Sequence, residues 1–163
     1  MRNSILYALA TFLIFSCQSV FAQKWVETVE LQQNKISNLQ IQIQKNTQII
    51  LEQDALRPNA ANLNNVDILQ IIYDHLSVTN SILTNIQVEQ MLFEMITGRP
   101  QISNAQKLMR LRQTQLQKEL SLRGEQLQRN SQQSKNNETT RLIFEARDLI
   151  KTTQEIVSNN FKY

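Results

Sequence analysis

The sequence predicts an all-α protein, an elongated antiparallel helical bundle with long, coiled-coil-like helices. Two glycines and two prolines occur among its 163 residues, several-fold below the average usage of these helix-breaking types. Aromatic residues make up 6% of the chain, and glutamine and asparagine are abundant. Apolar residues recur in steps of three and four over long stretches, the spacing that places them on one face of a helix. Together these features favour long helices that pack through narrow apolar seams.

Residues 1–22 are expected to be a secretory signal peptide. Arg2 supplies a positive start, residues 5–15 form an apolar run, and small or tolerated residues stand before a cleavage point after Ala22. The run is shorter than the about 20 apolar residues that span a bilayer, which disfavours a retained membrane helix. Cleavage between Ala22 and Gln23 takes 22 residues from 163 and leaves an exported helical domain of 141 residues, 23–163.

Cys17 allows a second interpretation of this leader. The stretch 14–17, Ile-Phe-Ser-Cys, resembles a lipoprotein signal, in which cleavage precedes the cysteine and its thiol is acylated. Phe15 is bulky where such signals carry a small residue, so we favour Cys17 as one more apolar residue of the leader. The chain contains one cysteine, and its removal leaves a mature protein that depends on packing, without disulfides.

The first half of the mature chain predicts two helices, over about 24–56 and 66–97. Pro58 and the polar stretch 59–65 separate them, and Asn65 or Asp67 is expected to cap the second helix. A proline at position 100 disfavours helix in the residue before it, so the second helix should end near Thr97. The expected seam of the first helix is Val29, Ile36, Leu39, Ile43 and Ile50, and that of the second is Leu69, Ile72, Leu76, Leu83, Ile86 and Phe93, with Thr79 and Gln90 as polar members.

The second half predicts helices over about 103–130 and 139–159. Ser103 or Asn104 is expected to cap the third helix, and Gly124 inside it costs about 1 kcal/mol relative to alanine, so we expect a weakened or kinked helix there. Residues 128–141 contain no large apolar side chain and form either a loop or an exposed helical extension. The expected seams are Leu108, Met109, Leu116, Leu120 and Leu127 in the third helix, and Leu142, Ala146, Leu149, Thr153 and Ile156 in the fourth.

Residue patterns that carry catalysis or ligand binding are missing. His75 is the one histidine, and no cysteine lies within the spacing of a zinc site. Two glycines do not make a loop that cradles phosphate. The net charge is +3, or +2 without Arg2, and its signs are scattered, unlike the clustered basic face of a nucleic-acid-binding protein. We therefore expect no catalytic, cofactor or metal residues, no nucleic acid and no small-molecule substrate: a non-enzymatic protein that works through its surface.

The junction between the second and third expected helices carries a family resemblance. An exported, Gln-rich helical chain has Thr97-Gly98-Arg99 at the end of one long helix, and another long helix follows. This arrangement resembles the VirB5/TraC family of type IV secretion systems, minor pilus components that commonly carry a Thr-Gly-x-Arg-Gly-Leu-Gly-like turn there. In this chain, Pro-Gln-Ile at 100–102 replaces the glycines. The length is similar to that of the short VirB5-like antigens of Bartonella-type bacteria.

The resemblance implies a minor pilin in the periplasm and on the cell surface or pilus of a Gram-negative bacterium. Such a protein is active in pilus assembly, in adhesion to host or recipient cells, and in virulence. Its implied partners are other secretion-system or pilus subunits and a receptor on the contacted cell. Thr97, Gly98, Arg99 and Pro100 then form a candidate protein-contact turn, although the sequence favours the simpler interpretation that these residues only turn the chain. Two alternatives stay open: a periplasmic coiled-coil chaperone or adaptor, and an outer-membrane lipoprotein anchored through Cys17.

Overall fold

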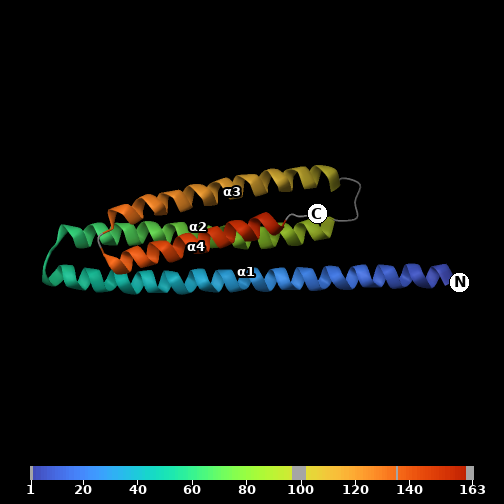
Figure 1. Ribbon diagram of the computed structural model, residues 1–163, viewed down its shortest axis with the longest axis horizontal. Coiled ribbons are helices and arrows are strands. Elements are labelled where there is room, and N and C mark those ends of the chain that lie inside the picture. The colour runs from blue at the N-terminus through green and yellow to red at the C-terminus, as the bar shows by residue number, and fades with distance from the viewer. Residues whose placement is uncertain (1, 97–101, 135, 161–163) are drawn as a thin grey trace.

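The expected all-α bundle is confirmed. The computed structural model describes the backbone of residues 2–96, 102–134 and 136–160, and the side chains of 24–90, 92, 106–134 and 136–159. These residues form four long helices, α1 (Arg2–Leu56), α2 (Ala60–Ile96), α3 (Ile102–Gln133) and α4 (Asn137–Asn160), which run alternately up and down an elongated rod (Figure 1). At 37 residues and 1.5 Å per residue, α2 is about 55 Å long.

The α1 helix runs without a break from the expected leader into the expected mature chain. We predicted a first helix over 24–56, and its end is correct, but its start in the structure is Arg2. The reason is local, since no glycine or proline lies between positions 2 and 56. The expected leader and the first helix of the bundle therefore share one helical backbone.

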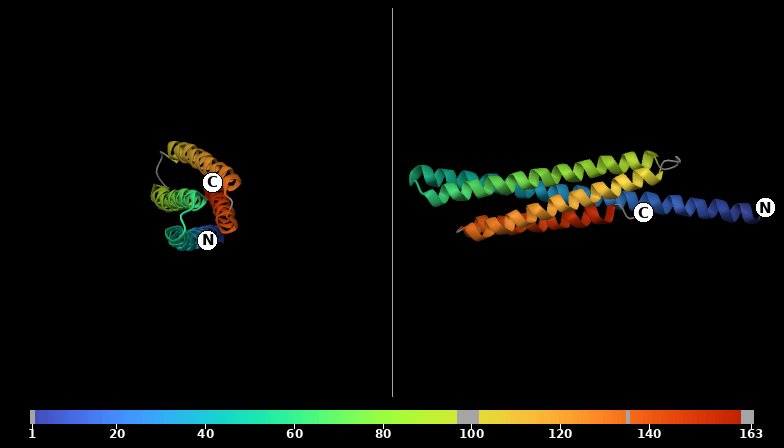
Figure 2. Two further views of the ribbon diagram at one scale, coloured as in Figure 1. Left: turned by 90° about the vertical axis from the view of Figure 1, so that its left-hand side faces the viewer. Right: turned by 90° about the horizontal axis from the view of Figure 1, so that it is seen from above.

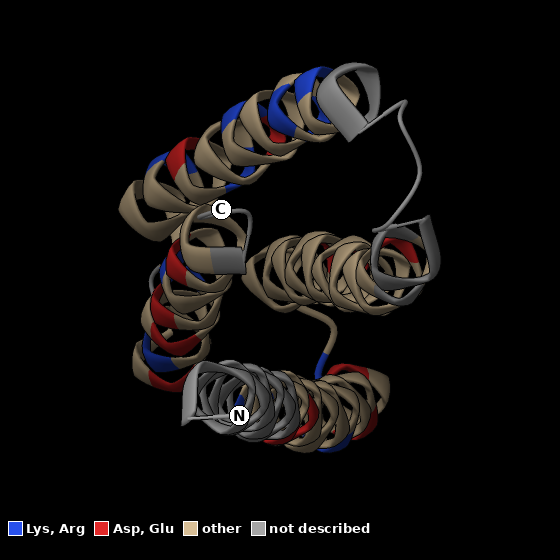
Figure 3. Cartoon of the chain, turned by 90° about the vertical axis from the view of Figure 1, so that its right-hand side faces the viewer, with Lys and Arg blue, Asp and Glu red and all other residues tan. Residues whose placement is uncertain are grey.

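The helices α2 and α4 lie between α1 and α3, as the end-on views show (Figures 2 and 3). Each of these two contacts all three other helices, whereas no contact joins α1 to α3 among the described residues. The apolar core fills the space around α2 and α4. Its buried side chains are Val29, Ile36, Leu39, Ile43, Ile50, Ile68, Leu69, Ile72, Leu76, Ile82, Leu83, Ile86, Leu116, Leu120, Leu127, Leu142, Ile143, Ala146, Ile150, Ile156 and Val157.

The predicted seams of α1, α2 and α4 are confirmed wherever their side chains are described, although Leu149 and Gln90 are only partly buried. Phe93 lies outside the described side chains. The α3 seam was wrong at one position, because Leu108 is 67% exposed. Leu116, Leu120 and Leu127 are buried as expected, which makes α3 the helix with the thinnest contribution to the core.

The start of α2 differs from the prediction. Neither Asn65 nor Asp67 caps this helix, which begins six residues earlier than expected, at Ala60. The cap is Asn59, whose side-chain Oδ1 accepts a hydrogen bond from the backbone N–H of Ala61 at 3.0 Å. Asp54 Oδ1 in turn accepts the N–H of Asn59 at 2.7 Å, so the end of α1 holds the start of α2 in a tight turn.

The polar stretch after Leu127 is mostly helical. The α3 helix continues to Gln133 and α4 begins at Asn137, so the exposed-extension alternative is the correct one. Asn136 caps α4, since its Oδ1 accepts the N–H groups of Glu138 and Thr139 at 2.9 and 3.0 Å. The α3 helix is continuous through Gly124, so the glycine does not interrupt it; the expected weakening or kink stays a prediction. At its other end α3 begins at Ile102, ahead of both predicted caps, whose side chains are not described.

Candidate protein-contact site

The expected site residues fall largely outside the described part of the structure. Thr97, Gly98, Arg99 and Pro100 lie in the undescribed stretch 97–101 between α2 and α3. Cys17, Ala22 and Gln23 lie on the helical backbone of α1, in the region whose side chains are not described. The turn, cleavage and lipidation hypotheses therefore stay predictions. What the structure does describe is the pair of helices that leads into the turn and out of it.

The ends of α2 and α3 next to this turn project beyond the end of α4 (Figure 1). Gln113 on α3 lies level with the end of α4, and we take this level as the limit of the four-helix part of the bundle. Its Nε2 donates hydrogen bonds to the carbonyls of Val157 and Ser158 at 2.9 and 3.0 Å. These carbonyls belong to the last turn of α4, where no further helical N–H is available to them. Gln113 thus closes the C-terminus of α4, and the first turns of α3 continue past it.

Beyond this limit the α2–α3 hairpin exposes an apolar tip patch, formed by Val88, Leu92, Leu108 and Leu111. Their side chains are 51–67% exposed. All four lie within about a turn of the ion pair between Arg112 Nε and Glu89 Oε1, 3.3 Å apart, which joins the two helices at this level. Leu108 is exposed because it lies off the buried face of α3, like Gln115 and Leu122 at the same heptad position. Neighbouring exposed apolar side chains of this kind mark contact surfaces more often than isolated ones do.

Charge is divided between the two helices of the hairpin. The α2 sequence contains aspartate and glutamate but no lysine or arginine, whereas lysine and arginine predominate on α3 (Figure 3). Lys107 and Arg110 are exposed on α3, as expected for a solvated helix face. The Arg112–Glu89 pair is partly exposed, with side chains 42% and 26% accessible, so it contributes at most about 1 kcal/mol to stability. Its main effect is to hold α3 against α2 beneath the tip patch.

His75 lies near the middle of α2 and is partly buried. Its Nδ1 lies 3.1 Å from Nη1 of Arg123 on α3, and Arg123 Nη2 also pairs with Glu119 at 2.7 Å. Burial lowers the pKa of His75 below its usual 6.5, the Arg123 charge lowers it further, and Asp74 partly opposes both effects. A neutral imidazole that accepts a hydrogen bond from a guanidinium links two helices, and this is a structural role.

The described residues do not bring other titratable groups together into a reactive cluster. In the part of the chain searched, no three His, Cys, Asp or Glu side chains are grouped as a metal site requires. Among the same residues, no helix has an apolar stretch long enough to cross a membrane. What the described surface offers is contact: the apolar tip patch, charged helix faces and a shallow groove between α3 and α4.

Comparison with known proteins adds no relative: no protein family, curated protein or solved structure matches this chain. The contact features rest on the geometry alone. Sequence reasoning missed Val88, Leu92 and Leu111 as a surface, since each lies off the core seam of its helix and their neighbourhood depends on how α2 packs against α3. Leu111, three residues after Leu108 and off the predicted seam, was the available signal.

Proposed function

We propose that this chain is an exported, non-enzymatic component of a type IV secretion pilus, a minor pilin of the VirB5/TraC kind. The observation that carries the proposal is the Thr97-Gly98-Arg99 sequence at the junction of two long helices in a four-helix rod. The fold supports this role because a rod of this shape presents its ends and sides to neighbouring subunits. The proposed partners are other secretion-system or pilus subunits and a receptor on a host or recipient cell.

The tip patch gives the proposal a contact surface. Leu108 and Leu111 are 67% and 58% exposed, at the end of the rod that leads into the turn 97–101. Burial of apolar surface contributes about 25 cal/mol per Å², so a partner that covers this patch gains affinity from side chains that the monomer leaves in water. In the proposed role, the tip patch and the neighbouring turn together make the assembly or adhesion contact.

The proposed location follows from the leader. Cleavage after Ala22 and export give a periplasmic protein that reaches the cell surface with the pilus. Mass spectrometry of the protein recovered from its host tests this step, with a mature chain that begins at Gln23 as the expected result. A cytosolic product that still carries Met1 would overturn export. Incorporation of labelled fatty acid that Cys17→Ala abolishes would establish the lipoprotein alternative instead.

The pilus role is tested by shearing surface appendages from the source bacterium and measuring the chain in the sheared fraction. We expect the wild-type chain in that fraction and the variant Leu108→Glu/Leu111→Glu in the periplasm. Leu56→Glu is the matched control, because Leu56 is 84% exposed at the opposite end of the rod. Equal helicity of all three proteins by circular dichroism separates a lost contact from a lost fold.

Two results would contradict the proposal. The first is a chain that stays wholly in the periplasm when appendages are present and sheared. The second is efficient suppression of client aggregation by the purified protein, which would favour the chaperone alternative.

A further inference from the structure

A shallow groove of about 530 Å³ runs between α3 and α4, remote from the tip patch. Leu120 and Ile150 lie along it, and both are buried. Gly124 also lines it, and a Cβ added at Gly124 would meet no atom within 4 Å. The missing side chain therefore leaves a hollow at this point of the α3 surface.

Five charged side chains line the same groove: Glu125, Arg129, Arg147, Asp148 and Lys151. Within the described residues, none of them takes part in an ion pair. Nearer the start of α4, Arg141 does pair, with both Glu138 and Glu145. Glu125 and Arg129 have the i,i+4 spacing that favours a pair on one helix, yet they are not joined. Arg147 lies instead 5.8 Å from the centroid of the Phe144 ring. These charges are available to a partner.

The composition of the groove indicates what kind of partner fits. Three cations and two carboxylates share it, so a polyanion such as nucleic acid would meet repulsion as well as attraction. A small anion would make no use of the apolar side chains and the hollow at Gly124. A helix that presents an aliphatic side chain between charges of both signs matches all of these features, because its ridge of residues four apart packs between two helices.

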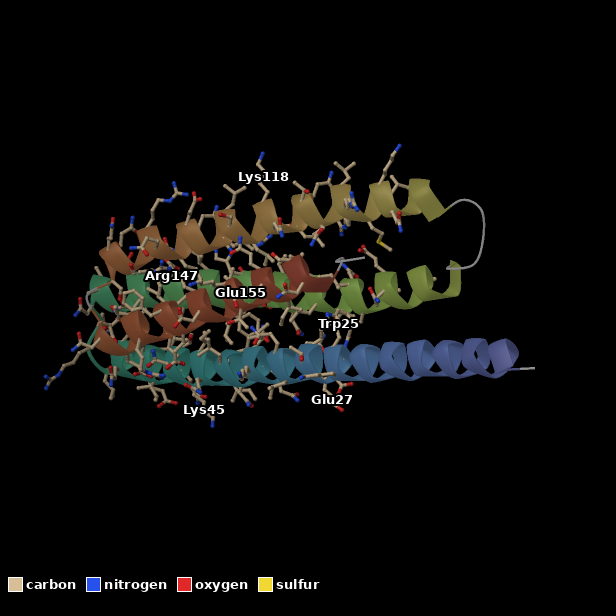
Figure 4. All side chains as sticks on the ribbon, turned by 45° about the vertical axis from the view of Figure 1, so that its right-hand side comes forward. Trp25, Glu27, Lys45, Lys118, Arg147 and Glu155 are labelled. Carbon is tan, nitrogen blue, oxygen red and sulfur yellow. The ribbon has the colours of Figure 1, made fainter. Side chains whose placement is uncertain are left out.

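The chain itself carries such a ridge, on the outer face of α1. We call Glu27, Leu31 and Lys35 the α1 ridge, since they follow one another at intervals of four residues. Leu31 is 57% exposed, and Glu27 and Lys35 are exposed without an ion pair among the described residues. Figure 4 shows Glu27 pointing away from the bundle. Eight residues of helix extend about 12 Å, close to the about 10 Å between the levels of Arg147 and Gln154 on α4.

We infer that the groove between α3 and α4 is a docking site for the α1 ridge of a second copy of this chain. Leu31 packs into the hollow at Gly124. Glu27 of the second copy faces the cations of α4, and its Lys35 faces Glu125 or Asp148. The contact is head-to-tail, because the ridge and the groove are different surfaces on opposite sides of a bundle in which α1 and α3 do not touch. Each copy therefore keeps one free ridge or one free groove for a further copy.

Sedimentation equilibrium of the protein recovered from its host tests this inference, which does not depend on the pilus role. We expect the average mass of the wild-type chain to rise with concentration. The groove variant Arg147→Glu/Lys151→Glu and the ridge variant Glu27→Lys should each associate about ten-fold more weakly, the effect of a few partly exposed charge contacts turned repulsive. The control is Lys107→Glu/Lys118→Glu, which changes the net charge by the same amount as the groove variant. Both lysines lie on α3 and neither lines the groove. Lys118 points away from the bundle (Figure 4).

A head-to-tail contact also predicts how mixtures of the variants behave. A mixture of the groove variant and the ridge variant should associate, because the intact ridge of one fits the intact groove of the other. A single chain that carries both sets of reversals should also regain self-association. A wild-type protein that is monomeric at every concentration, or self-association that the control weakens as much as the groove variant does, would overturn the inference. If the reversed side chains perturb folding, the neutral variant Arg147→Gln/Lys151→Gln replaces them with the same expected direction.

Discussion

Arg123 on α3 holds its guanidinium Nη1 3.1 Å from the imidazole Nδ1 of His75 on α2. The contact crosses the interface where α3 meets α2, and Glu119 steadies Arg123 from the same helix at 2.7 Å. The guanidinium is always a donor, so Nδ1 must be the acceptor and the ring must be neutral. Protonation of His75 would place a second positive charge against Arg123 and abolish the hydrogen bond.

Stability should therefore fall as the pH is lowered through the range in which His75 titrates. The pKa of His75 is lowered in the folded protein, by burial first and then by Arg123, while the unfolded chain keeps a value of about 6.5. Above about pH 6.5 the ring is neutral in both states and its contribution is constant. Below about pH 6.5 the unfolded state binds the proton more readily, so the free energy of unfolding decreases until the folded pKa is reached.

Urea denaturation at several pH values between about 7.5 and 5 measures this effect, in a range above the ordinary pKa of carboxylates. His75 is the only histidine in the chain, so His75→Gln should flatten the profile there. At about pH 7.5 this variant should lose less than about 1 kcal/mol, because the glutamine oxygen can replace the acceptor. An unchanged slope in His75→Gln would show that another group is responsible.

Gly124→Ala should stabilise the protein by about 0.5–1 kcal/mol. Glycine in a continuous helix costs about that much relative to alanine, and the new Cβ would meet nothing within 4 Å. Thermal denaturation measures the gain as a higher Tm. Ser121→Ala, one turn earlier on the same helix, is the control, with a gain of only about half as much from helix propensity. A neutral or destabilising Gly124→Ala would mean that α3 needs the bend that we first predicted there.

Asn136→Ala should cost about 1 kcal/mol, the typical loss for removal of an N-cap. Its Oδ1 accepts two backbone N–H groups of the first turn of α4, at 2.9 and 3.0 Å. Asn137→Ala is the matched control, because Asn137 is exposed and is the first residue of the helix. Chemical denaturation of both variants checks the difference. Equal stability of the two would show that ordered water replaces the cap.

The core of the bundle was predictable from sequence because buried positions repeat along each helix independently of its neighbours. The burial of Val29, Ile36 and Ile43, for example, follows from their seven-residue spacing alone. The helix starts were harder, since the asparagines after Pro58 resemble a loop until Asn59 is seen to cap α2. The tip patch and the groove were not predictable. The tip patch depends on which faces of α2 and α3 meet at the Arg112–Glu89 pair, and the hollow at Gly124 depends on the spacing of α3 and α4.

A buried polar contact between α1 and α4 provides the last test. Gln32 is 3% exposed and occupies a seam position between Val29 and Ile36. Its Nε2 donates to the carbonyl of Leu149 at 2.8 Å and lies 3.3 Å from Oγ1 of Thr153. An amide at a seam position must keep its partner or lose stability, so it favours the one register of α1 against α4 that provides it.

Gln32→Ala should therefore cost about 2–4 kcal/mol, from the lost hydrogen bonds and the cavity together. Gln32→Met, which fills similar space without polar atoms, should cost less than about 1.5 kcal/mol. Thr153→Val removes one partner at nearly constant shape, and the cycle with Gln32→Met should give a coupling energy of at least about 0.5 kcal/mol. Additive losses would show that Gln32 acts through packing and the Leu149 carbonyl alone, and that Thr153 has no part in setting the register.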